Sequence, residues 1–198
     1  MKHIKIGIKI TIFFAIVCGI IYPLVLTGIG QVAANKQANG SLIYVDGKPI
    51  GSKYIGQSFN NDPKYFHGRP SSINYNMTLE KTDNVPKSGG AVLAPDSKKL
   101  QEQVKEEIKL FLKQNPGVQA KDLPAELFTD SASGLDPDIS LRGAEVQIDR
   151  VSKNTGISKE KLNQFIKESE ISVSPSGTTL VNVLELNLNV AKEAKLIK

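Results

Sequence analysis

Cysteine, histidine and tryptophan are nearly or fully absent from this sequence of 198 residues. It has one cysteine, Cys18, two histidines, His3 and His67, and no tryptophan. A single cysteine excludes an intrachain disulfide and a zinc site built on several thiolates. A zinc site would need mostly carboxylate ligands, so we expect neither a structural nor a catalytic metal.

Acidic residues are missing from the N-terminal part of the chain, where the first one is Asp46. Lys2, Lys5 and Lys9 stand in that part, and the next basic residue is Lys36. The whole chain has 25 basic and 20 acidic residues, with a net charge of +5. Most of the positive excess therefore belongs to a short N-terminal tail, which argues against a basic nucleic-acid interface.

Charged residues are also absent from positions 10 to 35. A membrane-spanning helix needs about 20 apolar residues, whereas the apolar core of a signal peptide has about 7–15. We therefore expect a basic tail over 1–9 and a retained transmembrane helix over 10–34. The lysines before it predict a cytoplasmic N-terminus and a domain outside the cytoplasmic membrane. Export with cleavage after the small residues Val32-Ala33-Ala34 is the alternative.

The apolar run contains features that a simple anchor does not need. Pro23 has no N–H group, so the carbonyl of Gly19 would lose its helical partner, a defect best tolerated in a helix packed on neighbours. Ala15 and Gly19 form a small-xxx-small pair, and Cys18 and Tyr22 follow on the same face. Small residues also occur by chance in apolar runs, but we expect this helix to pack against other membrane helices.

The region after the apolar run mixes strand and helix signals. Strands on either side of Asp46-Gly47 predict a β-hairpin within positions 41–59. The clearest helix is expected from Pro95 to Asn115, with Asp96 or Ser97 as its cap. Between them, positions 73–94 are rich in turn formers and predict a loop with little regular structure.

Two further helices and a terminal element complete the expected domain. One helix should run from near Ser140 to Gly156, and another should begin at Ser158, with Ile157 and Leu162 as a hydrophobic staple. Positions 181–190 predict a short strand that passes into a terminal helix. The expected class is α+β: one extracytoplasmic domain over 35–198 on a single membrane helix.

Catalytic patterns are weak in this sequence. The stretch "GSKYIGQ" has glycines at phosphate-loop spacing but lacks the required lysine. A membrane-anchored hydrolase would have to combine His67 with Ser71 or Ser131, which the sequence alone does not bring together. The simpler interpretation of "YFHGRPS" is a structured loop, in which Arg69 could pair with a carboxylate.

A second distinctive stretch is "SASGLDPDIS", positions 131–140. Gly134 permits a turn with positive φ, and Ser140 can cap the helix that follows. Hydroxyl groups around a glycine before a helix can bind an anion, but they more often form a well-capped turn.

Several stretches taken together resemble the C subunit family of the Kdp high-affinity potassium-transporting ATPase. They occur in the family's order over nearly the whole chain: "YPLVLTGIGQ" (22–31), "ANGSLI" (38–43), "IGQSF" (55–59), "YFHGRPS" (65–71), "SGG" (88–90), "SASGLD" (131–136), "AEVQIDRV" (144–151) and "VNVLELNL" (181–188). Ala91 and Asp138 depart from the family pattern, so no role is carried over to them. The alternative is a stand-alone extracytoplasmic ligand-binding module. Without the resemblance, the residues would support that alternative and the accessory subunit almost equally.

The resemblance implies a non-catalytic subunit of a potassium import complex. Its partners would be a channel-like potassium-translocating subunit, a P-type ATPase subunit and often a small single-helix peptide. ATP and potassium would be handled by those partners, and no cofactor would be bound by this chain. The family is also described as a catalytic chaperone that raises the ATP affinity of the ATPase subunit; we expect such an effect to be coupled through the membrane subunits.

The resemblance also points to two sets of residues in this sequence. The candidates for partner contact in the membrane helix are Ala15, Gly19, Tyr22, Pro23, Gly28, Gly30 and Gln31. The motif-loop residues are Tyr65, Phe66, His67, Gly68, Arg69, Pro70, Ser71, Ser131, Ser133, Gly134, Leu135 and Asp136.

Overall fold

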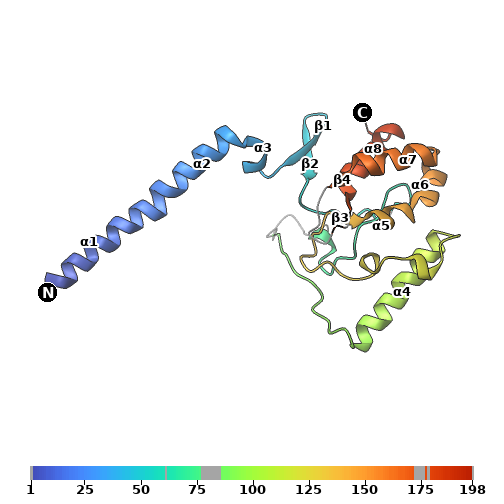
Figure 1. Ribbon diagram of the computed structural model, residues 1–198, viewed down its shortest axis with the longest axis horizontal. Coiled ribbons are helices and arrows are strands. Elements are labelled where there is room, and N and C mark those ends of the chain that lie inside the picture. Colours follow the sequence, from blue (N-terminus) through green and yellow to red (C-terminus); the bar gives the residue numbers. More distant parts are fainter. Residues whose placement is uncertain (1, 61, 77–85, 172–176, 178, 198) are drawn as a thin grey trace. The chain divides into compact units, whose positions relative to one another are not determined.

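A computed structural model describes residues 2–60, 62–76, 86–171, 177 and 179–197 (Figure 1). The chain forms two compact units, an N-terminal unit over Met1–Leu42 and a C-terminal unit over Ile43–Lys198. The expected α+β class is confirmed: one long apolar helix precedes a unit of short strands and helices.

The N-terminal unit contains one long apolar helix that is interrupted by a π turn. Helix α1 (Lys2–Ile16) leads into the π turn (Val17–Ile21), and α2 (Tyr22–Ala33) follows. In this wider turn the N–H of Tyr22 donates to the carbonyl of Val17, five residues back. The turn thus lies immediately before Pro23, where the sequence indicated a break in the hydrogen-bond ladder.

This helix begins earlier than the expected membrane span. Positions 2–9, expected as a basic tail, are already helical, and the segment long and apolar enough to cross a membrane is Lys2–Ala33. The boundary between tail and membrane span stays a prediction. After Ala33 the chain bends at Ala34 and forms the single-turn helix α3 (Asn35–Ala38).

The C-terminal unit begins with the predicted hairpin. Strands β1 (Leu42–Val45) and β2 (Lys48–Ser52) pair across Asp46 and Gly47, whose φ angles are 50° and 74°. Two consecutive positive φ angles are the mark of a type I′ turn, the usual turn of a two-residue hairpin.

A second, three-stranded antiparallel sheet has the strand order β3-β5-β4. It consists of β3 (Asp138–Ser140), β4 (Glu170–Ile171) and β5 (Leu180–Asn182), with Ile139 opposite Val181. The helices that accompany it are α5 (Leu141–Glu145), α6 (Ile148–Thr155), α7 (Lys159–Glu168) and α8 (Val183–Glu193) (Figure 1). The strand-to-helix passage predicted for 181–190 is confirmed by β5 and α8.

The single helix expected from Ser140 to Gly156 was wrong in one respect, because the chain forms two helices there. The break lies at Val146 and Gln147, where the N–H of Gln147 bonds to the carbonyl of Ala144, only three residues back. The predicted ends are confirmed: the Ser140 hydroxyl accepts from the third residue of α5, and Gly156 has a φ of 76°. Ser158 caps α7 in the same way as Ser140 caps α5.

Helix α4 (Lys98–Gln114) lies apart from α5–α8 in Figure 1. Ser97 occupies its N-cap position without a side-chain hydrogen bond, and Asn115 ends it, as predicted. Phe111 attaches it to the core, where its ring meets Phe128 edge to face at 5.5 Å between centroids. Residues 86–97 contain no helix or strand, as expected of the loop over 73–94, whose positions 77–85 lie outside the described residues.

The hydrophobic core gathers side chains from α4 to α8, from β3 and β5, and from loops. Its large, fully buried members include Phe66, Ile139, Leu162, Val181 and Leu186. Phe66 belongs to the "YFHGRPS" stretch, so this loop is part of the core and not an appendage on its surface.

Candidate functional site

The C-terminal end of the long apolar helix carries a small cluster of amide side chains. The side-chain oxygen of Gln31 accepts from Asn35 at 2.8 Å and from Asn39 at 3.1 Å, and its amide nitrogen donates to Asn39 at 3.2 Å. A Cβ atom placed on Gly30 would lie 3.6 Å from Ala38. Gln31 and Gly30 therefore hold α3 folded back on the end of α2; the sequence alone had not identified Asn35 and Asn39 as their partners.

The remaining helix candidates have no such contacts within the described chain. None of the residues of α1, the π turn or α2 is buried, and Tyr22 is 60% exposed. A Cβ atom on Gly19 or Gly28 would meet no heavy atom within 4 Å. The face shared by Ala15 and Tyr22 crosses the π turn, so its α-helical spacing holds only on either side of that turn.

In the C-terminal unit, four of the resembling stretches converge into what we call the motif cluster: residues 55–59, 65–71, 88–90 and 131–136. Four hydrogen bonds of 2.8–3.0 Å join them: Gly56 N to Leu135 O, Gly89 N to Ser133 O, Ser131 N to Pro70 O, and Ser71 Oγ to Gly134 O. These segments lie far apart in the sequence, yet the fold brings them into direct contact.

Tyr75 is the residue around which the motif cluster packs. It is 7% exposed, and its hydroxyl donates to the backbone carbonyl of Arg69. Burial raises the pKa of this phenol to about 12, which keeps it protonated. A Cβ on Gly56 would lie 2.6 Å from the Tyr75 ring, and a Cβ on Gly68 would lie 3.1 Å from its hydroxyl. The Tyr75 hydroxyl thus lies close to Gly68, whereas the space at Gly56 is limited both by the Tyr75 ring and by the carbonyl oxygen of Asp136, 2.5 Å from the same Cβ.

The backbone around Tyr75 is strained. Asn74, Tyr75 and Asn76 have φ angles of 47°, 51° and 59°, three successive non-glycine residues in the left-handed region. Each such residue costs about 1–2 kcal/mol. No role for Tyr75 was predicted, and the one indication in the sequence is that it is the single aromatic residue of positions 73–94.

Arg69 pairs with a carboxylate, as expected. Its Nη1 lies 2.9 Å from Oδ2 of Asp136, and its Nη2 is 3.4 Å from the carbonyl of Asp130. The pair joins the "YFHGRPS" loop to the "SASGLD" loop. Both side chains are partly exposed, so its contribution to stability is small, about 1 kcal/mol or less.

His67 lies inside the unit, next to a buried arginine. It is 8% exposed, and its Nε2 is 3.2 Å from the carbonyl of Asp62 and 3.3 Å from Nη1 of Arg150. Burial, and then the positive charge of Arg150, lower the pKa of His67 to about 4. The imidazole is therefore neutral at physiological pH.

The serines that a hydrolase would need form hydrogen bonds with groups other than His67. The Ser71 hydroxyl donates to the carbonyl of Gly134, and the Ser131 hydroxyl contacts that of Ser133 at 3.1 Å. In the described part of the chain, no hydrogen bond joins His67 to a serine hydroxyl. The arrangement gives no support to a Ser–His catalytic pair.

The hydroxyls of the "SASGLD" stretch also serve the turn itself. Ser133 Oγ accepts from the N–H of Leu135, and Ser131 Oγ accepts from the N–H of Asp136. Gly134 has a φ of 68°, and a Cβ there would lie 2.6 Å from the carbonyl of Gly89. These contacts favour a capped turn over an open anion site.

A buried polar network, formed by Gln147, Arg150, Asn115 and Asn187, holds the "YFHGRPS" loop in place. Arg150 is 4% exposed and has no carboxylate partner among the described residues; its guanidinium donates instead to the carbonyls of Pro63 and Tyr65, both at 2.8 Å. It also donates to the side-chain oxygens of Asn115 and Gln147. Burial lowers the pKa of Arg150 to about 10, which leaves it charged.

The two other amides of the network bond to the backbone of the loop. Gln147 accepts from the N–H of His67 at 2.8 Å and donates to its carbonyl at 3.0 Å. Asn187 makes the same pair of bonds to Phe66, both at 2.8 Å. The stretches "AEVQIDRV" and "VNVLELNL" carried the family resemblance, but the sequence did not indicate these roles. The sequence feature that could have identified Gln147 and Asn187 is a polar residue among the apolar positions of an expected helix.

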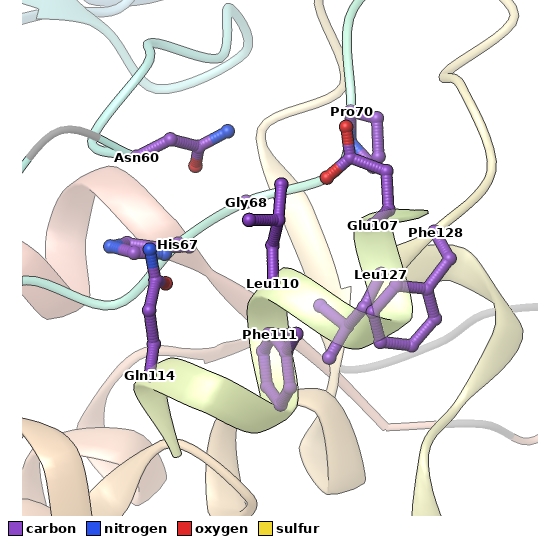
Figure 2. A pocket seen from close by; sticks show the side chains of 10 residues that line it. All are labelled: Asn60, His67, Gly68, Pro70, Glu107, Leu110, Phe111, Gln114, Leu127 and Phe128. Carbon is purple, nitrogen blue, oxygen red and sulfur yellow. The ribbon is translucent and has the colours of Figure 1, made fainter. Parts of the chain in front are cut away.

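A groove lies between α4 and the motif cluster (Figure 2). It consists of two adjoining cavities of about 250 Å³ and about 420 Å³, which share Asn60, Pro70 and Glu107. Figure 2 shows the side chains of Glu107 and Leu110 pointing from α4 toward the loop that contains Gly68 and Pro70. In the described residues, no group of three or more His, Cys, Asp or Glu side chains is placed to hold a metal ion.

Comparison with known proteins agrees with the resemblance seen in the motifs. The profile of the family described as "KdpC: K+-transporting ATPase, c chain" matches residues 4–192. A "Potassium-transporting ATPase KdpC subunit" of Clostridium kluyveri is 44% identical over 97% of this chain and 94% of its own length. Proteins with the same description in Bacillus cereus strain Q1 and Bacillus anthracis are 46% identical over 95% of this chain and 94% of theirs. The chain therefore belongs to the KdpC family, the c chains of the K+-transporting ATPase.

Proposed function

We propose that this chain is a non-catalytic accessory and assembly subunit of an ATP-driven potassium import complex. Its apolar helix spans the membrane with the N-terminus in the cytoplasm, and its C-terminal unit lies outside. The relatives described as potassium-transporting ATPase subunits support this proposal. ATP and potassium are handled by other subunits, and this chain binds neither.

The helix is the part that docks. One observation carries this step: a helix of 32 residues, apolar enough to span a membrane, leaves all of its side chains unburied within the chain. A helix with small residues and a π turn gains stability by packing on neighbouring membrane helices. We propose the channel-like subunit as the neighbour, with the P-type ATPase subunit and a small single-helix subunit completing the complex.

The C-terminal unit then covers the channel-like subunit from outside. Its buried polar network and motif cluster give it a rigid shape, which suits a structural role better than a catalytic one. An effect of this unit on ATP affinity would have to cross the membrane. We propose that it does so by coupling through the membrane subunits, without a direct contact between this chain and ATP.

The test replaces Gly19 and Gly28 by leucine in the full chain, with Gly7→Leu as the matched control. A Cβ atom added at any of the three positions would meet no heavy atom within 4 Å, so the chain itself tolerates each change. We expect Gly19→Leu or Gly28→Leu to lower co-purification with the membrane subunits by about tenfold or more, because close helix approach is blocked. Gly7→Leu, near the N-terminal end of the helix, should leave it unchanged.

Two results would contradict the proposal. Assembly that is equally resistant to all three changes would show that this helix is not the docking element. A chain recovered alone, and shortened by cleavage after Ala34, would show that the apolar segment is removed and that the unit acts as an exported protein.

A further inference from the structure

The groove beside the motif cluster has the dimensions of a binding site for an extended peptide. Its wall on α4 runs from Lys99 to Gln114. At 1.5 Å per residue this wall is about 22 Å long, the length of about six or seven extended residues. Asn60, Pro70 and Glu107 line both cavities, so the two adjoin beside the motif loop.

Glu107 is the unusual group in this groove. Its side chain is half-buried, it lines both cavities, and no described residue forms a hydrogen bond or an ion pair with it. Its neighbour Glu106 is exposed and has a weak contact with Lys109 at 3.9 Å. A half-buried carboxylate without a partner is costly unless a positive group compensates it. A second carboxylate, Asp130, lines the same cavity, where its Oδ1 lies 3.5 Å from the amide nitrogen of Gln103. Lys99 also lines this cavity, eight positions before Glu107 on α4, and no described ion pair joins it to Glu107.

Next to Glu107 the groove becomes apolar. Leu110 is 53% exposed at its rim, and Leu127 and Phe128 lie in its wall (Figure 2). The rest of the lining is mostly amides and hydroxyls, including Asn60, which can bond to a peptide backbone. The combination fits a chain segment with one basic and one apolar side chain in neighbouring positions.

We propose that this groove binds an extended extracytoplasmic segment of a partner membrane subunit, with a lysine or arginine of that segment paired to Glu107. The inference rests on the proposed function, because it requires a partner subunit on the same side of the membrane. It goes beyond the membrane helix by assigning a second contact, with its own surface and its own charge requirement. The charge of Glu107 supplies the specificity, and the apolar part next to Leu110 supplies burial.

The experiment places a photo-cross-linking side chain, p-benzoylphenylalanine, at Leu110 in the full chain within the assembled complex in membranes. The matched control carries the same probe at Lys109, whose side chain is 78% exposed. We expect the Leu110 probe to cross-link to one short segment of a membrane subunit that contains a lysine or arginine. The Lys109 probe should give about tenfold less of that product, because it lies outside the groove.

The charge requirement is tested in the same preparation. Glu107→Gln should lower the Leu110 cross-link by about fivefold, which corresponds to about 1 kcal/mol of lost ion pairing. Glu106→Gln removes the same charge from the adjacent exposed position and should leave the yield unchanged.

The outcomes separate the two proposals. A Leu110 probe that reacts only with lipid, only with a second copy of the chain, or with nothing overturns the inference, and so does an equal yield with Glu107→Gln. If the chain still co-purifies with the membrane subunits in those cases, the proposed function stands and only the groove assignment fails. If the chain does not assemble with them at all, both proposals fail together.

Discussion

The residues that carry the family resemblance are mostly exposed in the membrane helix but mostly buried or half-buried in the C-terminal unit. In the helix, Tyr22 is 60% exposed and Gly19 and Gly28 face open space within the chain. In the C-terminal unit, Phe66 is fully buried and His67 is 8% exposed. Apart from Gly30 and Gln31, the described part of the chain leaves the first set exposed, whereas the second set packs and forms hydrogen bonds within the C-terminal unit.

The two sets of residues should therefore respond differently to substitution. Changes at exposed helix positions should leave folding intact and act on assembly, because these side chains are not part of the described C-terminal unit and set how closely a neighbouring helix can approach. Changes in the motif cluster should act first on the free energy of unfolding, because buried polar atoms lose their hydrogen bonds. The following predictions test that division, from the largest expected effect on stability to the smallest.

Arg150→Met should have the largest effect. The change removes the guanidinium donor from the carbonyls of Pro63 and Tyr65 and from the side-chain oxygen of Asn115. It also removes one of the two donors to the side-chain oxygen of Gln147, which keeps the N–H of His67. We expect a loss of about 4 kcal/mol in the free energy of unfolding. Urea unfolding of the full chain in detergent, followed by near-ultraviolet circular dichroism, measures it.

Arg142→Met is the matched control for this prediction. The Arg142 side chain is 53% exposed, and its ion pairs with Asp122 and Glu145 are long, at 3.9 and 3.5 Å. Its one described hydrogen bond, from Nε to the carbonyl of Asp122 at 3.3 Å, is also exposed. It should change the free energy of unfolding by about 0.5 kcal/mol or less. Equal losses for the two arginines would contradict the structural role assigned to the buried network.

His67 should make the stability of the C-terminal unit depend on pH. Its pKa is about 4 in the folded unit, below the value of 6.5 for the free side chain, because burial and the neighbouring Arg150 disfavour the charged form. The stability that comes from a neutral His67 is therefore complete above pH 6.5 and is lost as the pH falls toward 4. At pH 5 the loss should be about 2 kcal/mol.

His67→Gln removes this titration while keeping a polar side chain of similar length. We expect the variant to be less stable than the parent at pH 7 and to close the gap by about 2 kcal/mol at pH 5. Asp138, whose pKa is raised by burial to about 6, titrates in both proteins and so cancels from the comparison. A gap that stays constant from pH 7 to pH 5 would show that His67 is not buried in neutral form.

Features that depend on residues close together in the sequence could be predicted, whereas features that depend on distant residues could not. The Asp46-Gly47 hairpin and the caps at Ser140 and Ser158 depend on neighbouring residues, and all three predictions are confirmed. Pro23 indicated a disturbed helix, but periodicity cannot choose a π turn among the ways to accommodate it.

Features that depend on contacts between residues far apart in the sequence could not be predicted. The break between α5 and α6 occurs at Gln147, whose side chain bonds to His67, 80 positions away. The left-handed conformation of Tyr75 is tolerated because the ring is buried beside Gly56 and Gly68. The grouping of the motif stretches could be recognised as a resemblance, but the hydrogen bonds that join them to one another could be seen only in three dimensions.

Gln31 is an exception to the division between exposed helix residues and residues held by contacts within the chain. It belongs to the helix set, yet its amide bonds to Asn35 and Asn39 within the same unit. These bonds are exposed, so Gln31→Leu should change the free energy of unfolding of the C-terminal unit by about 0.5 kcal/mol or less. It should instead raise amide hydrogen exchange at Asn39 and Ser41 several-fold, because their N–H groups bond to carbonyls within the turn that Gln31 holds. Exchange at these two amides that equals that of the parent would mean that the backbone alone maintains the bend, and Gln31 would then join Tyr22 and Gly28 as a residue whose contacts lie outside its own chain.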